Sequence, residues 1–221
     1  PELSARWQAA LNNAAKTSQY VRQSQRYPLT ARGDINYAML FAELSRQLVA
    51  PDGLVGLLVP SGIATDNTTK HFFGDLMEKK AISALYDFEN KEGVFADLHR
   101  AFKFSVLLMN GCDRQTDDAD FVFFARSIED LKPRDRHIRL TARDLKLLNP
   151  NTRTCPIFRT RRDCEMTKRV YRTLPILIDK SRKTGGNPWA IQFVRMFDQT
   201  NDAEHFRTAP SLQDDGFHLK G

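Results

Sequence analysis

The residues of this chain best suited to chemistry at a binding surface are basic ones in its second half. Residues 132–183 hold 16 Lys/Arg against 5 Asp/Glu, whereas the whole chain has a net charge of only +6. Clustered cations gain free energy when they displace counterions from phosphates, so this asymmetry indicates a polyanion partner, with a solvated basic surface as the alternative. Because most contacts to a duplex are made to its backbone, these side chains are expected to touch phosphate rather than read bases. The candidate nucleic-acid-binding residues are Arg153, Arg159, Arg161, Arg162, Lys168, Arg169 and Arg172.

Two short motifs imitate catalytic signatures. Pro51-Asp52 followed by Glu78 and Lys80 spells the pattern of many restriction nucleases. That chemistry needs both acidic groups on neighbouring strands around Mg²⁺, but Asp52 is expected in a turn and Glu78 near a helix end. The sequence NPW at residues 187–189 resembles a shortened form of a catalytic motif that contains two consecutive prolines, yet it lacks the second proline and follows a Gly-Gly turn. We therefore assign no catalytic residue to either motif.

Composition argues for an ordinary globular protein without a metal site. Hydrophobic residues make up 41% of the chain, which is enough to form a core. The five histidines have no metal-ligand spacing, and the three cysteines have no paired spacing that would indicate zinc or a disulfide framework. No apolar run is long enough to cross a bilayer, and the N-terminus has no signal-peptide pattern. The simplest interpretation is a reduced, cytoplasmic protein that does not enter a membrane.

Helices and strands are expected to alternate over residues 1–127, which predicts an α/β domain. The apolar run at residues 54–59 is typical of a strand buried on both faces of a parallel sheet. A helix capped by Thr65 or Asp66 is expected to run to Lys80, with Phe72, Phe73, Leu76 and Met77 buried. The other helices expected in this part are residues 3–24 and 34–49, and its other strands are residues 82–88, 102–109 and 120–126.

Residues 128–221 are expected to form a second, small mixed α+β domain that is basic. Thr141 should cap a short helix, and Thr160 with Asp163 fits a capping box for a helix that ends near Thr173. Residues 176–178 and 189–197 are predicted as strands around a Gly-Gly turn. The chain begins with Pro1 and stops after Lys220 with no evident terminator, so we expect a piece of something larger.

The order and spacing of several motifs carry a family resemblance. They are RGDINY at residues 32–37 with LFAE at 40–43, PDGLVGLLVPS at 51–61, YDFEN at 86–90 with EGVF at 92–95, NPNT at 149–152 with PIFR at 156–159 and RRD at 161–163, and NPW at 187–189 with MF at 196–197. Together the motifs cover most of residues 20–207. The chain resembles the part that follows the catalytic motif in gamma-class DNA adenine methyltransferases, especially the large fused restriction–modification proteins.

The resemblance implies the C-terminal half of a doubly wound methyltransferase sheet. Residues 54–59 resemble its fifth strand, residues 82–88 its sixth and residues 102–109 its seventh, which the family inserts antiparallel beside the fifth. The family's glycine-rich cofactor loop and its Asn/Asp-Pro-Pro-aromatic motif are not in this chain. The cofactor, S-adenosylmethionine, would therefore be held mainly by residues outside it. Residues 1–127 would belong to the methyltransferase domain, and residues 128–221 would begin a target-recognition domain.

Two aromatic residues match positions with a role in that family. Phe41 corresponds to an aromatic that packs on the adenine ring of the cofactor, although it also fits the apolar pattern of its helix and could be a core residue. Phe95 lies between the sixth and seventh strands, where the family places an aromatic that stacks on the flipped target base. An adenine extruded from the duplex loses its stacking, and a ring face restores about 1–3 kcal/mol of it.

The function implied is part of an enzyme that transfers a methyl group from S-adenosylmethionine to the amino group of adenine in DNA, in a restriction–modification or phage-defence system. Its partners would be double-stranded DNA and the rest of the parent chain, and this piece alone should be inactive. Two alternatives stay open. One is a non-catalytic nucleic-acid-binding module, and the other is a methyltransferase-linked piece of a restriction endonuclease.

Overall fold

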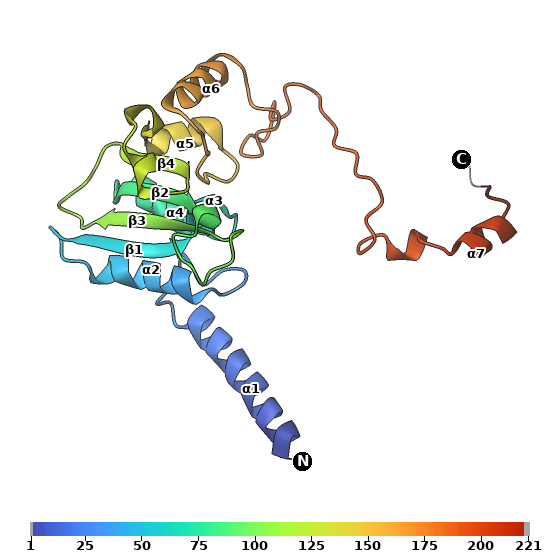
Figure 1. Cartoon of the computed structure of the whole chain (residues 1–221). Coiled ribbons are helices and arrows are strands. Elements are labelled where there is room, and N and C mark those ends of the chain that lie inside the picture. The colour runs from blue at the N-terminus through green and yellow to red at the C-terminus, as the bar shows by residue number, and fades with distance from the viewer. Residues whose placement is uncertain (1, 219–221) are drawn as a thin grey trace.

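The computed structural model describes residues 2–218 and contains one five-stranded mixed sheet with helices around it (Figure 1). The strands are β1 (Leu54–Pro60), β2 (Ile82–Glu89), β3 (Lys103–Asn110), β4 (Ala119–Ala125) and β5 (Ile138–Leu140), in the spatial order β1-β3-β2-β4-β5. β3 runs antiparallel to both of its neighbours, so β1 and β2 point the same way. β4 joins the sheet parallel to β2, and β5 closes it as an antiparallel edge.

The expected α/β class is confirmed, and so are the strands expected at residues 54–59, 82–88 and 102–109. The longer helices are also where the sequence indicates them, within a few residues. The helices are α1 (Glu2–Gln23), α2 (Tyr37–Leu48), α3 (Gly62–Thr65), α4 (Lys70–Glu78), α5 (Ala142–Leu148), α6 (Arg161–Thr173) and α7 (Ala209–Asp214), with short 3-10 turns η1 (Asn90–Glu92), η2 (Ile128–Leu131), η3 (Arg134–Arg136) and η4 (Ala203–His205).

The main core lies on the face of the sheet that α2 and α4 cover. Phe72, Phe73, Leu76 and Met77 of α4 are all buried there, as their helical spacing predicts. Residues from the basic second half enter the same core, among them Ile138 and Leu140 of β5, Leu145 of α5, Cys155, and Cys164 of α6. The expected division of the chain after residue 127 stays a prediction, but the segment up to α6 packs together with the sheet.

The opposite face of the sheet is covered only in part. Side chains alternate along a strand, so residues 54, 56 and 58 of β1 share this face with residues 104, 106 and 108 of β3. Phe88, Phe104, Val122 and Ala125 form a small second cluster here, whereas Leu54 and Leu58 are exposed. β1 is also a sheet edge, because β3 is its single strand partner among the described residues. Apolar surface and an unpaired strand edge therefore coincide at β1.

The structure corrects two expectations about secondary structure. The helix expected from Thr65 or Asp66 to Lys80 is shorter, since α4 begins at Lys70 and ends at Glu78 and the separate short helix α3 precedes it. Thr69 Oγ1 donates to the carbonyls of Gly62 and Asp66 and stabilises the turn between α3 and α4. Residues 176–178 and 189–197 are not strands, and the described chain from Leu174 to Asp202 contains neither helix nor strand. This segment leads away from the sheet towards α7 (Figure 1), so its backbone has no neighbouring strand to pair with.

Outside the sheet, α1 projects from the body as a single helix of which Val21 is the one buried residue (Figure 1). No described helix combines the length and apolar character needed to cross a bilayer.

A histidine links β4 to the turns before β5. His137 Nδ1 lies 2.7 Å from Asp120 Oδ2, and His137 Nε2 lies 2.7 Å from the carbonyl oxygen of Leu131. Tyr86 donates to the same carboxylate oxygen at 3.0 Å, and Arg139 Nε lies 3.5 Å from Asp120 Oδ1. Both ring nitrogens thus face acceptors, so the Leu131 carbonyl and the Asp120 carboxylate raise the pKa of His137 above 6.5, against the effects of burial and of Arg139.

This raised pKa predicts a pH-dependent stability. Protonated His137 stabilises the fold, and this contribution should be fully present below about pH 6.5 and lost as the pH rises through the folded-state pKa. We expect the difference in unfolding free energy between wild type and His137→Gln, from urea titrations, to be larger near pH 6 than near pH 9. A difference that is constant, or that grows with pH, would mean that the ring is neutral in the folded protein.

Candidate nucleic-acid interface at one end of the sheet

The antiparallel insertion of β3 gathers several chain segments at one end of the sheet. In register, Pro60 at the end of β1 pairs with Phe104, Glu89 at the end of β2 pairs with Lys103, and Phe88 pairs with Ala125 at the end of β4. The carboxyl ends of the three parallel strands therefore meet the start of β3. In open α/β sheets this is the end at which ligands bind.

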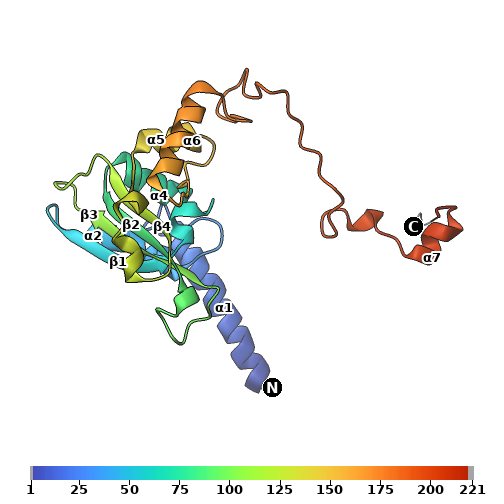
Figure 2. The same ribbon diagram turned by 45° about the horizontal axis from the view of Figure 1, so that its top comes forward.

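The loop between β2 and β3, residues 90–102, projects beyond the strands at this end (Figure 2). It is held by the side chain of Asn90, which is fully buried. Asn90 Nδ2 donates to the carbonyls of Phe95 and Leu98 at 3.0 and 2.8 Å, and Asn90 Oδ1 accepts from the backbone N–H of Phe95 at 3.0 Å. Asn90 also donates its own N–H to the carbonyl of Phe102. One amide thus closes the loop on itself and fixes the backbone of Phe95.

Phe95 is positioned at the surface rather than in the core. Its ring packs edge-on against Phe104, with centroids 5.0 Å apart, and 42% of the residue stays exposed. With Leu58, Leu98 and Phe104 it lines a shallow, mostly apolar hollow of about 440 Å³. Phe104 in turn stacks on Phe88. The hollow is therefore a hydrophobic surface, with the partly exposed ring of Phe95 at its rim, that could bind a flat apolar group.

A buried carboxyl and a strained residue lie beneath this end of the sheet. Ser105 Oγ donates to Asp87 Oδ1 at 3.0 Å, and burial raises the pKa of Asp87 above its ordinary value. Phe124 of β4 has a φ of +57° and lies near Asp87, where the pairing between β2 and β4 shifts register. A non-glycine residue in this conformation costs about 1–3 kcal/mol, and such residues cluster at functional sites.

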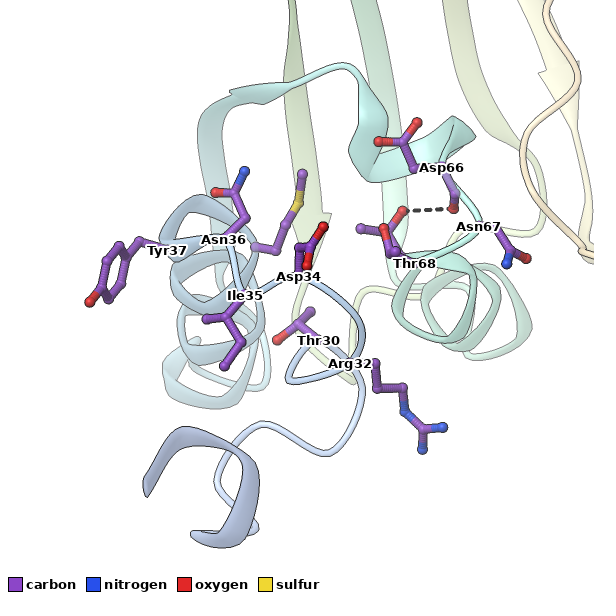
Figure 3. A pocket seen from close by; sticks show the side chains of 11 residues that line it. Thr30, Arg32, Asp34, Ile35, Asn36, Tyr37, Asp66, Asn67 and Thr68 are labelled. Atoms are coloured by element: carbon purple, nitrogen blue, oxygen red, sulfur yellow. Dashed lines mark hydrogen bonds between the residues drawn. The ribbon is translucent and has the colours of Figure 1, made fainter. Parts of the chain in front are cut away.

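A polar pocket of about 690 Å³ lies beside the start of α2 (Figure 3). Residues 30–37 form one wall, and residues 66–69 before α4 form the other. The first wall is held by Glu43, a buried carboxylate of α2 that accepts from the N–H of Leu29 and from both the N–H and the hydroxyl of Thr30. Asn36 caps α2 by accepting from the N–H of Ala38 at 2.9 Å, which places Tyr37 at the rim.

Phe41 lies outside the core. It is 61% exposed and follows Tyr37 by one helical turn, with Leu48 two turns further on the same outward face of α2. Packing within the described residues therefore does not explain this phenylalanine. The cofactor contact expected of it remains a prediction.

The seven predicted basic residues do not all reach the surface. Arg153, Arg159, Arg161, Arg162, Arg169 and Arg172 are exposed on α6 and the segment before it. Lys168 is buried, with 8% of its side chain exposed, and its Nζ lies 2.7 Å from Glu165 and 3.6 Å from Asp144. This lysine joins α6 to α5 and is not available to a phosphate in this structure.

The motifs that imitate catalytic signatures lie apart from this end of the sheet. Asp52 is in the turn before β1, and Glu78 ends α4, where it pairs with Lys146 and Arg153. In the described part of the chain, no three metal-ligating side chains converge. Residues 187–189 lie in the irregular segment after α6, where Trp189 Nε1 donates to the Pro175 carbonyl.

No protein-family model matches the sequence, and no curated protein matches it significantly. Among solved structures, the chain is similar to one from the ATP-dependent Type ISP restriction-modification enzyme LlaBIII bound to DNA. The sequence identity is 8% and the TM-score is 0.34. The match covers 50% of this chain and 9% of that one, so the matched part is a small fraction of a much longer protein.

Sequence reasoning did not identify the two buried side chains that position these loops. Glu43 follows the buried Met39 by one helical turn and therefore lies on the apolar face of its helix. A charged residue at such a position indicates a buried polar contact and could have been recognised in the sequence. Asn90 directly follows a strongly apolar strand and precedes Gly93 by three residues, as a loop-closing amide does. Neither signal in the sequence predicts which loop the side chain binds.

The three hydrogen bonds of the Asn90 side chain predict that its removal destabilises the loop at residues 91–102. Asn90→Ala leaves the N–H of Phe95 and two carbonyls without partners, and each buried unsatisfied group costs about 1–3 kcal/mol. We expect a lower unfolding free energy and faster hydrogen exchange confined to residues 91–102. Ser83→Ala, which removes a weaker side-chain bond at the other end of β2, serves as the control. Unchanged exchange in the loop of the Asn90 variant would show that other contacts hold Phe95.

Proposed function

We propose that this chain is the DNA-facing, C-terminal part of the catalytic domain of an S-adenosylmethionine-dependent DNA adenine methyltransferase, with the first part of its target-recognition region. One observation carries the proposal. β3 is inserted antiparallel between the parallel strands β1 and β2, and the loop that leads into it presents Phe95 at the carboxyl end of the sheet. This is the arrangement that the sequence motifs imply.

The geometry of Phe95 supports a role in holding an extruded base. A flipped adenine needs an aromatic ring to stack on, and the face of that ring must not be covered by other side chains of the protein. Phe95 meets both requirements, because its backbone is fixed by Asn90 while its side chain borders an open apolar hollow. A residue whose backbone is already fixed loses less conformational entropy when a base stacks on its ring.

Phe41 and the edge strand β1 support a larger assembly. S-adenosylmethionine supplies the methyl group, and the exposed ring of Phe41 is suited to pack on the adenine of that cofactor. The glycine-rich loop and the catalytic motif that the family uses would come from the part of the sheet beyond β1, whose unpaired edge fits a continuing sheet. The role of this chain is then to hold the DNA and the target base, while the transfer takes place on residues outside it.

The test uses the longer protein that carries the catalytic motif. Phe95→Ala should lower methylation of duplex DNA by roughly 10- to 100-fold, from a stacking loss on the order of 1–3 kcal/mol, and should reduce 2-aminopurine fluorescence at the target position. Phe95→Trp should retain much of the activity because it keeps an aromatic face. Phe41→Ala should instead weaken cofactor binding first.

Stability measurements separate this role from packing. A buried phenylalanine cut to alanine costs about 3–5 kcal/mol, and we expect Phe104→Ala to behave so. Phe95→Ala should cost clearly less. If Phe95→Ala unfolds the protein as readily as Phe104→Ala, while the folded fraction flips the base normally, the proposed role is wrong.

The present chain alone should show no methyl transfer, and turnover above a no-protein control would contradict the placement of the active site.

A further inference from the structure

Three cations surround one carboxylate at the carboxyl end of β2. Glu89 Oε2 lies 2.9 Å from Lys91 Nζ and 3.6 Å from Arg126 Nε, and Glu89 Oε1 lies 3.4 Å from Lys103 Nζ. The cations come from η1, from the start of β3 and from the residue after β4. They are separate in sequence, and the pairing of the strands brings them together.

The four side chains differ in their access to solvent. The Glu89 side chain is 10% exposed, whereas those of Lys91, Lys103 and Arg126 are each about half exposed. The carboxylate therefore lies beneath the cations and orients them, and two positive charges are left in excess. Glu92 and Asp97 lie in the same loop, but in the described part of the chain neither pairs with these cations. Such an outward-facing group of three cations suits an anion with several oxygens.

The cation cluster is continuous with the two surfaces already described. Lys103 Nζ lies 5.7 Å from the centre of the Phe124 ring, and the guanidinium of Arg159 lies 4.6 Å from the same centre. Phe124 thus connects the cluster to Arg159, which is exposed just before α6. In the other direction, Glu89 directly precedes Asn90, which holds Phe95, and Arg100 donates to the carbonyl of Lys91 at 3.4 Å.

From this juxtaposition we propose that Lys91, Lys103 and Arg126, oriented by Glu89, form a binding site for a backbone phosphate of DNA next to the nucleotide whose base stacks on Phe95. The identity of the ligand as DNA rests on the proposed function. A base pulled from the duplex carries its flanking phosphates with it, so a cation site beside the stacking residue holds the distorted backbone in place. None of these three residues belongs to the basic run at residues 132–183.

The test is the salt dependence of DNA affinity for the full chain, measured by fluorescence anisotropy with a labelled short duplex. Each phosphate contact contributes about 0.9 to the slope of log affinity against log salt concentration. Lys103→Gln with Arg126→Gln should therefore lower the slope by roughly 1, because one phosphate contact is lost, and should weaken binding most at low salt. Lys103→Arg with Arg126→Lys keeps both charges and should preserve most of the slope, which controls for misfolding.

Lys80 offers a matched control. Its side chain is 47% exposed and paired with Asp117, close to the 48% of Lys103, but it lies at the amino end of β2. Lys80→Gln should leave the slope unchanged. The proposal is overturned if the double glutamine variant keeps the wild-type slope, if Lys80→Gln lowers the slope equally, or if the wild-type chain shows no salt-dependent binding of DNA.

The outcome is independent of methyl transfer. A reduced slope in the double glutamine variant, together with a longer protein that does not methylate DNA, would support the phosphate site and refute the methyltransferase. An unchanged slope, together with loss of methylation in Phe95→Ala, would do the reverse. If the slope falls when the charges of Arg161 and Arg162 are reversed but not in the double glutamine variant, the phosphate contacts are made by α6 and the proposed site is wrong.

Discussion

The antiparallel position of β3 between β1 and β2 is the constraint on which the candidate site depends. Two parallel strands with an antiparallel strand between them place the end of β2 beside the start of β3. The connection between them must therefore turn at the carboxyl end of the sheet, where β1 and β4 also end. If β3 ran parallel, residues 90–102 would have to cross to the other end, and Phe95 and the cations around Glu89 would not share a surface.

Buried polar side chains turn this topology into a defined surface. Asn90 satisfies three backbone groups of the β2–β3 loop, and Glu43 satisfies three donors in the loop before α2. Glu89 forms ion pairs with three cations from different elements and so holds them together. In each case one buried polar residue is stabilising because its partners are in place, and removing it would leave several groups unsatisfied. Apolar side chains such as Phe95 and Leu58 are then exposed without disturbing the core.

Much of the fold could be predicted from the sequence, because strong local signals agree with the tertiary structure. The apolar runs of β1, β2 and β3 and the helix caps at Thr141 and Thr160 were readable in this way, although the full capping box is at Thr141 and not at Thr160 as expected. The strands expected at residues 176–178 and 189–197 failed because an alternating pattern without a neighbouring strand does not make a sheet. The burial of Lys168 was not readable, since its two carboxylate partners include Asp144 on another helix. The cation cluster was missed for the same reason: its members are brought together only by strand register.

The central claim is that the carboxyl end of the sheet, from Phe95 to Arg159 and α6, is one DNA-binding surface. Hydrogen exchange of the full chain with and without a DNA duplex tests it most directly. The account predicts slower exchange at residues 90–103 and 159–172 when DNA is bound. It predicts no change in the turns at the opposite end, residues 50–53, 79–81 and 111–117, which pack against one another. Protection at those turns, or protection confined to residues 159–172, would contradict it.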